Sequence, residues 1–90
     1  MAQAIGSPEE LEKFARDLKQ FNGQLAENMN RLQAQFTQLG DTWRDQEQQR
    51  YAQEFAQTMR VLQQFSRSSD QQIPFLLRKA QRLREYLSQR

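Results

Sequence analysis

The 90-residue sequence contains no cysteine and no histidine. The missing cysteines exclude a disulfide framework and a thiolate metal site. The missing histidines remove the commonest metal ligand and the side chain most often used as a general base. We therefore expect a protein that is not an enzyme, with no catalytic residue, no metal site, no cofactor and no small-molecule substrate.

Glycine and proline are also scarce, with three and two residues, whereas glutamine occurs 17 times. Glutamine and the other common polar residues here are good helix formers, and the length fits one domain. The sequence therefore predicts a single all-α domain over 1–90. No stretch of 18 apolar residues is present to span a membrane. The N-terminus has neither a basic n-region nor an apolar h-region, so no cleavable secretory signal is expected.

One apolar row follows the first half of the chain at a spacing of seven residues. Phe14 and Phe21 fall three residues after its first two members, and this second row then moves by one position to Met29 and Phe36. Such 3–4 spacing predicts one long amphipathic helix over about 8–39. The first row consists of Leu11, Leu18, Leu25, Leu32 and Leu39.

The segment Ser7-Pro8-Glu9-Glu10 is typical of a helix start, with Ser7 as the N-cap and Pro8 at the first helical position. The adjacent carboxylates of Glu9 and Glu10 could suggest acid–base chemistry. In a first helical turn, however, acidic residues have an ordinary role beside the positive end of the helix dipole.

The apolar pattern breaks at residues 40–45, where we predict a sharp turn. Gly40 fits the left-handed position that ends many helices, and Asp41 or Thr42 could cap the next helix. A connection this short places two helices side by side and antiparallel. The expected fold is therefore an antiparallel two-helix hairpin.

The second helix is expected over about 43–88, with an interruption. Pro74 cannot donate a helical hydrogen bond and disfavours helical geometry at the residue before it. The apolar stripe also lapses nearby, where Ser69 or Asp70 could cap a restarted helix. We therefore predict a break or kink within 68–74.

This sequence has more apolar surface than the seam of a single hairpin can cover. The consecutive Phe75, Leu76 and Leu77 would span roughly 200° of helix circumference. Exposed patches of this kind usually mark interfaces, so we predict a homodimer that forms a four-helix bundle. The predicted dimer core comprises Leu11, Phe14, Leu18, Phe21, Leu25, Leu32, Phe36, Leu39, Phe55, Leu62, Phe65, Leu76 and Leu83.

Charge is divided between the two halves of the chain. Residues 1–47 hold 8 acids and 5 bases, whereas residues 48–90 hold 3 acids and 8 bases. This division favours a dimer in which the acidic turn of one chain lies near the basic end of the other, although exposed pairs contribute only about 0–1 kcal/mol each. Bases near a helix C-terminus also complement its dipole, so nucleic acid or membrane binding by this end is the weakest alternative.

Trp43 is the most informative single residue, because tryptophan is enriched in binding hot spots. Its ring could cover the open end of the hairpin core, anchor a partner, or do both. The residues that we expect to contact a partner are Trp43, Arg44, Asp45, Phe75, Leu77 and Tyr86.

These features together resemble the WXG family of small type VII secretion substrates, of the early-secreted-antigen type. The resemblance runs from Ser7 through the central turn with Trp43 to Leu83. Two positions depart from the family pattern and indicate a divergent member. Trp43-Arg44-Asp45 lacks the glycine that the family has two residues after the tryptophan. Tyr86 is followed four residues later by Arg90, where the family's export signal has Asp or Glu.

The resemblance implies a dimerising helical hairpin that acts through protein–protein contacts, as a type VII secretion substrate or the secretion partner of one. Its partners would be a second copy or a related hairpin protein, and further a secretion ATPase or an exported effector. The protein would then be secreted without a cleavable signal peptide. The alternative is a cytoplasmic adaptor or structural helical-bundle protein with no export role.

Overall fold

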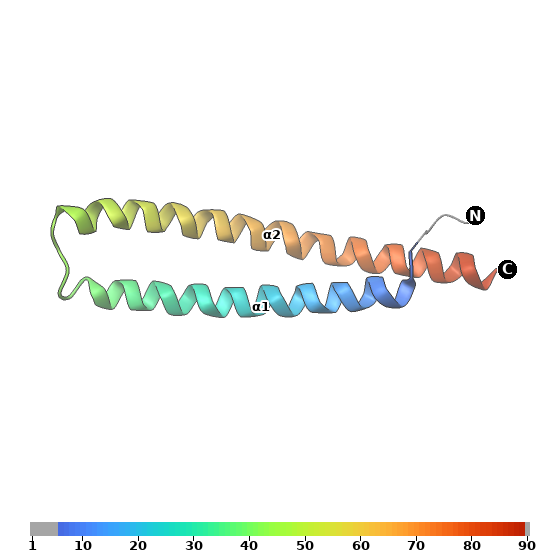
Figure 1. Cartoon of the computed structure of the whole chain (residues 1–90). Helices are drawn as coiled ribbons and strands as arrows, with labels where there is room; N and C mark the ends of the chain where they lie inside the picture. The colour runs from blue at the N-terminus through green and yellow to red at the C-terminus, as the bar shows by residue number, and fades with distance from the viewer. Residues whose placement is uncertain (1–5, 90) are drawn as a thin grey trace.

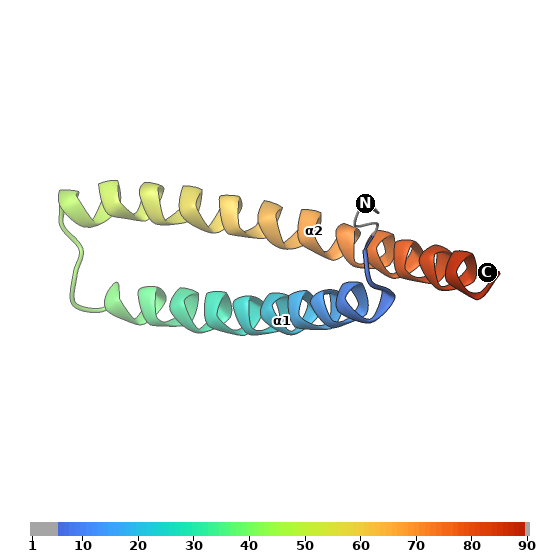
Figure 2. The same ribbon diagram turned by 45° about the vertical axis from the view of Figure 1, so that its right-hand side comes forward.

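The computed structural model describes residues 6–89, which form two long helices joined by one short connection (Figure 1). α1 spans Pro8–Leu39 and α2 spans Gln46–Ser88. The helices run antiparallel, and α2 continues past the start of α1 in both views (Figure 2). The all-α hairpin predicted from the sequence is confirmed. The predictions that rest on residues 1–5 and on Arg90 lie outside the described residues.

α1 begins at a capped and closely packed N-terminus. Ser7 is extended, and its Oγ accepts a hydrogen bond from the backbone N–H of Glu10 at 3.3 Å. Pro8 follows at the first helical position, where no N–H is needed. Gly6 has a φ of 107° and brings the chain against α2, because a Cβ at this position would lie 3.1 Å from Cδ1 of Leu83. The absence of a side chain at Gly6 therefore lets the segment before α1 pack on α2.

α1 ends at Gly40 in a conformation that differs from the prediction. Gly40 has φ −64° and ψ −14°, which is right-handed and not the left-handed conformation expected of a C-terminal glycine. Its N–H still bonds to the carbonyl oxygens of Phe36 and Thr37, at 3.3 and 3.2 Å. A Cβ at Gly40 would lie 3.2 Å from the Thr37 carbonyl oxygen, so glycine suits this position through its small size.

α2 begins later than the sequence indicated. Asp45 is extended, and its Oδ1 accepts a hydrogen bond from the backbone N–H of Gln48 at 3.0 Å. The prediction that Asp41 or Thr42 would cap the helix was therefore wrong. Their backbone N–H groups bond instead to carbonyls at the end of α1, which extends the turn and places the first residue of α2 at Gln46.

α2 is continuous across the segment in which we predicted a break or kink. Residues 68–74 are helical throughout, and Pro74 lies inside the helix. The predicted break is therefore wrong, while a bend of the helix axis without loss of helix stays a prediction. Ser69 and Asp70 do not cap a new helix, because both accept hydrogen bonds from Asn22 of α1. These contacts join α2 to α1 about one helical turn before Pro74.

The seam between the helices is built from smaller and more polar residues than the sequence indicated. Only Ala15 and Ala80, at 1% and 0% exposure, are fully enclosed among residues 6–89, and no larger side chain is. The predicted leucine row lies beside this seam, half-buried or exposed. The buried residues of α1 recur at every seventh position and are Pro8, Ala15, Asn22 and Met29. Those of α2 are Met59, Ser69, Ala80 and Leu83.

A polar contact joins the two helices near the middle of this seam. Asn22 is 5% exposed, and its Nδ2 donates hydrogen bonds to Ser69 Oγ and Asp70 Oδ1, both at 2.9 Å. The carboxylate of Asp70 can only accept, so it requires the amide nitrogen of Asn22 on its side. Ser69 and Asp70, which lie where the apolar stripe of α2 lapses, are therefore the residues that α2 contributes to this contact.

Candidate interaction surface

Four aromatic rings gather at the turn end of the hairpin, and we call them the aromatic cluster: Phe36, Trp43, Tyr51 and Phe55. The ring centroid of Phe36 lies 4.8 Å from that of Phe55 and 5.8 Å from that of Tyr51. The Tyr51 centroid lies 6.0 Å from that of Trp43. Rings at these separations attract each other beyond the effect of burial alone, so the aromatic cluster holds the turn end of the two helices together.

Trp43 is half-buried, whereas its neighbours Arg44 and Asp45 are exposed. The backbone N–H of Trp43 bonds to the Leu39 carbonyl at 2.9 Å. Arg44 Nε donates to the Gly40 carbonyl at 2.8 Å, and Asp45 caps α2. The three residues that we expected to contact a partner at this end thus also build the turn, and their exposed parts form one polar–aromatic tip.

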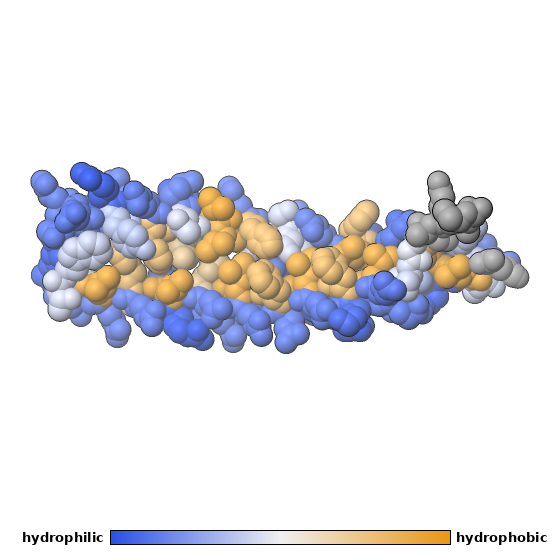
Figure 3. Space-filling model, viewed as in Figure 1, coloured by the Kyte–Doolittle hydropathy of each residue, from blue (hydrophilic) through white to orange (hydrophobic). Residues whose placement is uncertain are grey.

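An apolar band follows the seam from the turn toward the C-terminal end on the face shown in Figure 3. Monomeric proteins rarely expose a contiguous apolar patch larger than a few hundred Å². Phe14 and Phe21 are 56% and 51% exposed, although phenylalanine is among the residues most often buried. The apolar band is therefore a candidate interaction surface.

The predicted dimer-core residues differ in how much of their surface the hairpin itself covers. Leu83 is buried in the seam. The half-buried members are Leu11, Leu18, Leu25, Phe36, Phe55, Leu62 and Leu76. The exposed members are Phe14, Phe21, Leu32, Leu39 and Phe65.

The six predicted partner-binding residues do not form one site. Trp43, Arg44 and Asp45 lie at the turn, whereas Phe75, Leu77 and Tyr86 lie in the far half of α2. Phe75 follows Asp45 by 30 positions in the sequence, which corresponds to about 45 Å along a helix at 1.5 Å per residue. The three distant side chains are all exposed, at 55%, 45% and 58%. Any partner that contacts both groups must therefore run along the length of the hairpin.

An ion-pair cluster that the sequence analysis missed closes the other end of the hairpin. Arg84 of α2 donates through Nη1 and Nη2 to the carboxylate of Glu12, and through Nη2 to Glu9 at 3.3 Å. The hydrogen bonds from Arg84 lower the pKa of Glu12. The pKa of Glu9 is lowered first by its own backbone N–H and then by Arg84. Glu12 and Glu9 raise the pKa of Arg84 in turn.

This ion-pair cluster shows that one base of the basic C-terminal end is engaged within the chain. Arg84 is one of the eight bases in residues 48–90, and its ion pairs with Glu9 and Glu12 join α2 to α1. Glu9 likewise pairs with Arg84, in addition to placing a negative charge in the first turn of α1. The spacing of acids at 9 and 12 was visible in the sequence, but only the register of the hairpin shows which arginine they meet.

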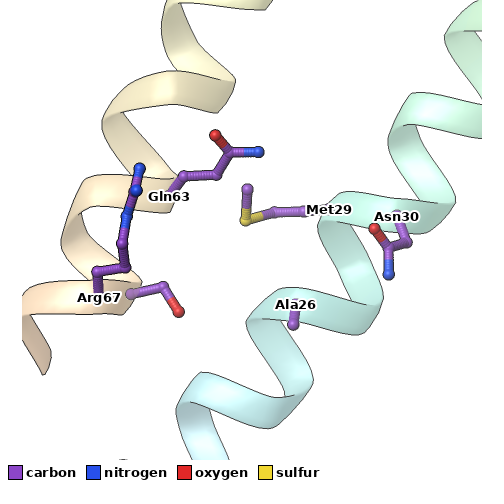
Figure 4. Close-up of a pocket in the computed structure, with 6 residues that line it drawn as sticks. Ala26, Met29, Asn30, Gln63 and Arg67 are labelled. Atoms are coloured by element: carbon purple, nitrogen blue, oxygen red, sulfur yellow. The ribbon is translucent and has the colours of Figure 1, made fainter. Parts of the chain in front are cut away.

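A groove of about 400 Å³ opens between the helices in the middle of the hairpin (Figure 4). The figure shows Met29 reaching from α1 toward Gln63 of α2, with the short side chain of Ala26 beside it. Small-molecule sites usually enclose most of their ligand, whereas this groove is open to solvent. It is lined by Ala26, Met29, Asn30, Gln63, Ser66 and Arg67.

Within residues 6–89, no group of three or more acidic side chains converges in the way that a metal ion requires. In the same range neither helix has a segment long and apolar enough to cross a bilayer.

Comparison with known proteins gives one family and several similar structures. The WXG100 family, described as proteins of 100 residues with WXG, matches residues 5–86. No curated protein sequence matches the chain.

The similar structures are of a secreted protein, EsxB, from Bacillus anthracis strain Sterne. One wild-type crystal structure is 30% identical in sequence, has a TM-score of 0.77, and covers 93% of this chain and 97% of its own. The selenomethionine-labelled form is 29% identical, with a TM-score of 0.77 and coverage of 96% and 98%. The mutant E54Q of the same protein is 28% identical, with a TM-score of 0.78 and 96% coverage of both chains. The likeness therefore extends over nearly the whole length on both sides.

Proposed function

Because this chain belongs to the WXG100 family, we propose that it is a type VII secretion substrate, or the secretion partner of one, and that it acts through protein–protein contacts and not as an enzyme. One observation carries the proposal: the chain shares length, fold and 28–30% of its residues with secreted EsxB structures. The protein would then be exported from the cell by this secretion machinery. Asp45, which stands where the family has a glycine, marks it as a divergent member.

The apolar band supports dimerisation as the first of these contacts. Packing a second hairpin on the band would cover the exposed members of the predicted dimer core and give a four-helix bundle. The partner is a second copy or a related hairpin protein. After Arg84 is paired within the chain, Arg78, Lys79 and Arg82 remain at the basic end to face the acidic turn of an antiparallel partner.

The polar–aromatic tip supports a second contact. Trp43 is half-buried and lies beside exposed charges of both signs on Arg44 and Asp45. A secretion ATPase or an exported effector that recognises the folded hairpin would find here an aromatic ring with fixed charges next to it. Such a combination is typical of binding hot spots.

Export from the native host tests the proposal. The chain would be produced with a small epitope tag, and its amount in culture medium compared between the parent strain and a strain without its secretion ATPase. We expect the protein in the medium of the parent strain only, with a cytoplasmic enzyme confined to cells in both.

Retention of the protein inside the cells of both strains would contradict the export role. That result would favour the cytoplasmic adaptor or structural role, and a crosslinking experiment from Trp43 would then identify the partner inside the cell.

A further inference from the structure

Asn22 is followed by Gly23, a dipeptide in which asparagine is chemically labile. The backbone nitrogen of a glycine can reach the preceding side-chain Cγ, because glycine has no Cβ to restrict the approach. The other two asparagines, Asn28 and Asn30, are each followed by a bulky residue. Asn22 is therefore the position at which this chain is most open to spontaneous deamidation.

The folded hairpin blocks that reaction in two ways. Residues 22 and 23 lie within α1, where the N–H of Gly23 belongs to the helical hydrogen-bond ladder and a ψ near −42° keeps this nitrogen away from Cγ. The Asn22 side chain is also held, since it is 5% exposed and its Nδ2 donates to Ser69 and Asp70 at 2.9 Å.

An unfolded chain has neither protection. The Gly23 nitrogen then forms a bond to Asn22 Cγ, the bond from Cγ to Nδ2 breaks, and ammonia leaves to give a cyclic imide. Water opens the imide at one carbonyl to give aspartate, or at the other to give isoaspartate. The overall change is hydrolysis of an amide, so water is the only other reactant.

Neither product fits the seam. An aspartate at position 22 presents an oxygen to Asp70 Oδ1 in place of the donor Nδ2, which sets two acceptors and two negative charges against each other. Asn22 Oδ1 already lacks a hydrogen-bond partner among the described residues, so the Ser69 hydroxyl is the one donor shown beside the new carboxylate, and it cannot remove the repulsion from Asp70. Isoaspartate adds a main-chain atom in the middle of α1 and interrupts its hydrogen-bond ladder.

We propose that Asn22–Gly23 is a deamidation site that the folded hairpin suppresses, and that its reaction prevents the chain from returning to this fold. The inference goes beyond the proposed function and does not rest on it. A chain that remains unfolded is thereby altered covalently and no longer returns to this fold, whereas a folded chain keeps its amide.

Peptide mass spectrometry tests the protection. The full chain would be incubated in mildly alkaline buffer, either folded or held unfolded by urea, and digested with trypsin. One tryptic peptide, 20–31, carries Asn22, Asn28 and Asn30, so two asparagines serve as internal controls. We expect conversion at Asn22 to be slower by roughly a hundredfold or more in the folded chain, because it requires opening of α1.

The variant Gly23→Ala is the matched control. An added Cβ at this position meets nothing within 4 Å, so the hairpin should fold as before. In urea the variant should deamidate at Asn22 slower than the parent by roughly tenfold or more. Equal rates at Asn22 in folded and unfolded chain, or no effect of Gly23→Ala in urea, would overturn the proposed site.

The effect on refolding has its own test. Asn22→Asp should lower the melting temperature or abolish helical folding, and Asn22→Asp with Asp70→Asn should recover most of the loss, because the donor then comes from position 70. Asp70→Asn alone keeps a donor and an acceptor on both sides and is the control. An Asn22→Asp variant that melts like the parent, or a double variant without recovery, would overturn the second half of the proposal.

Discussion

At Trp43 the indole ring is half-buried beside Tyr51, and its backbone N–H is bonded to the end of α1. Such a residue contributes to the turn and still presents part of its ring to solvent. Its two possible roles, packing and recognition, are therefore separable by experiment.

Replacing Trp43 with alanine should weaken partner binding more than folding. We expect a loss of about 2 kcal/mol or more in partner affinity, the scale of a hot spot. The loss in stability should stay below the roughly 3–5 kcal/mol of a fully buried tryptophan. Urea denaturation and partner capture on the same variant measure the two effects, with Trp43→Phe as the ring-preserving control. Outright unfolding by Trp43→Ala would assign the residue to the core and remove the recognition role.

The pairing of Arg84 with Glu12 and Glu9 predicts how stability depends on pH. Because the folded state lowers both carboxyl pKa values below their ordinary value of 4.5, folding is favoured while the carboxylates are charged. This stabilisation is present above about pH 4.5 and is lost as pH falls through the lowered pKa values.

The variant Glu12→Gln should therefore be less stable than the parent near neutral pH. It should also lose less stability than the parent when the pH is lowered. Melting temperatures across the acidic range measure both. Glu10→Gln is the matched control in the same helical turn, since Glu10 makes no ion pair with Arg84 in the described structure. Parallel profiles for the parent and Glu12→Gln would show that this pair does not contribute.

At the scale of the elements, the sequence predicted local features better than contacts between distant residues. The heptad leucines and the Ser7 cap are local signals, and the structure has α1 where they indicate it. The continuity of α2 could not be predicted in the same way. Pro74 read alone indicates an interruption, whereas in the structure Ser69 and Asp70 stay helical and accept hydrogen bonds from Asn22, more than 40 positions away.

Since Pro74 lies inside a continuous helix, its replacement with alanine should stabilise the hairpin. Proline in a helix interior costs about 3 kcal/mol relative to alanine. Replacing it also makes the unfolded chain more flexible, which stabilises the unfolded state by about 1 kcal/mol. We therefore expect a net gain of about 2 kcal/mol, measured as a higher urea midpoint. Gln72→Ala replaces one exposed helix former by another and should have little effect. A destabilised Pro74→Ala variant would show that proline has a favourable role in α2.

At the scale of the whole molecule, the candidate surface was predicted only in part. The large apolar residues of the sequence do exceed what one seam covers, as Phe14 and Phe21 show by their exposure. The seam itself was not predicted, because alanine and asparagine at positions 15 and 22 give no apolar signal. Small residues let the helices meet there, and the larger side chains then lie beside the seam, half-buried or exposed.

Dimerisation should therefore depend on the apolar band. Phe14→Glu places a charge on an exposed apolar position and should shift the protein from dimer to monomer in sedimentation at micromolar concentration. The melting temperature of the parent, but not of this variant, should rise with protein concentration. Gln24→Glu adds the same charge at an exposed polar position of α1 and should leave the dimer intact. A monomeric parent would contradict the predicted four-helix bundle.

The dimensions of the hairpin, 68 × 21 × 19 Å, describe a narrow rod. A channel slightly wider than 21 Å would admit this rod lengthwise without melting either helix. A bundle of two such hairpins, with helix axes about 8–10 Å apart, needs a wider opening. Under the proposed function, the width of the export channel would determine whether the protein crosses as a folded pair, as a separated hairpin, or as an unfolded chain.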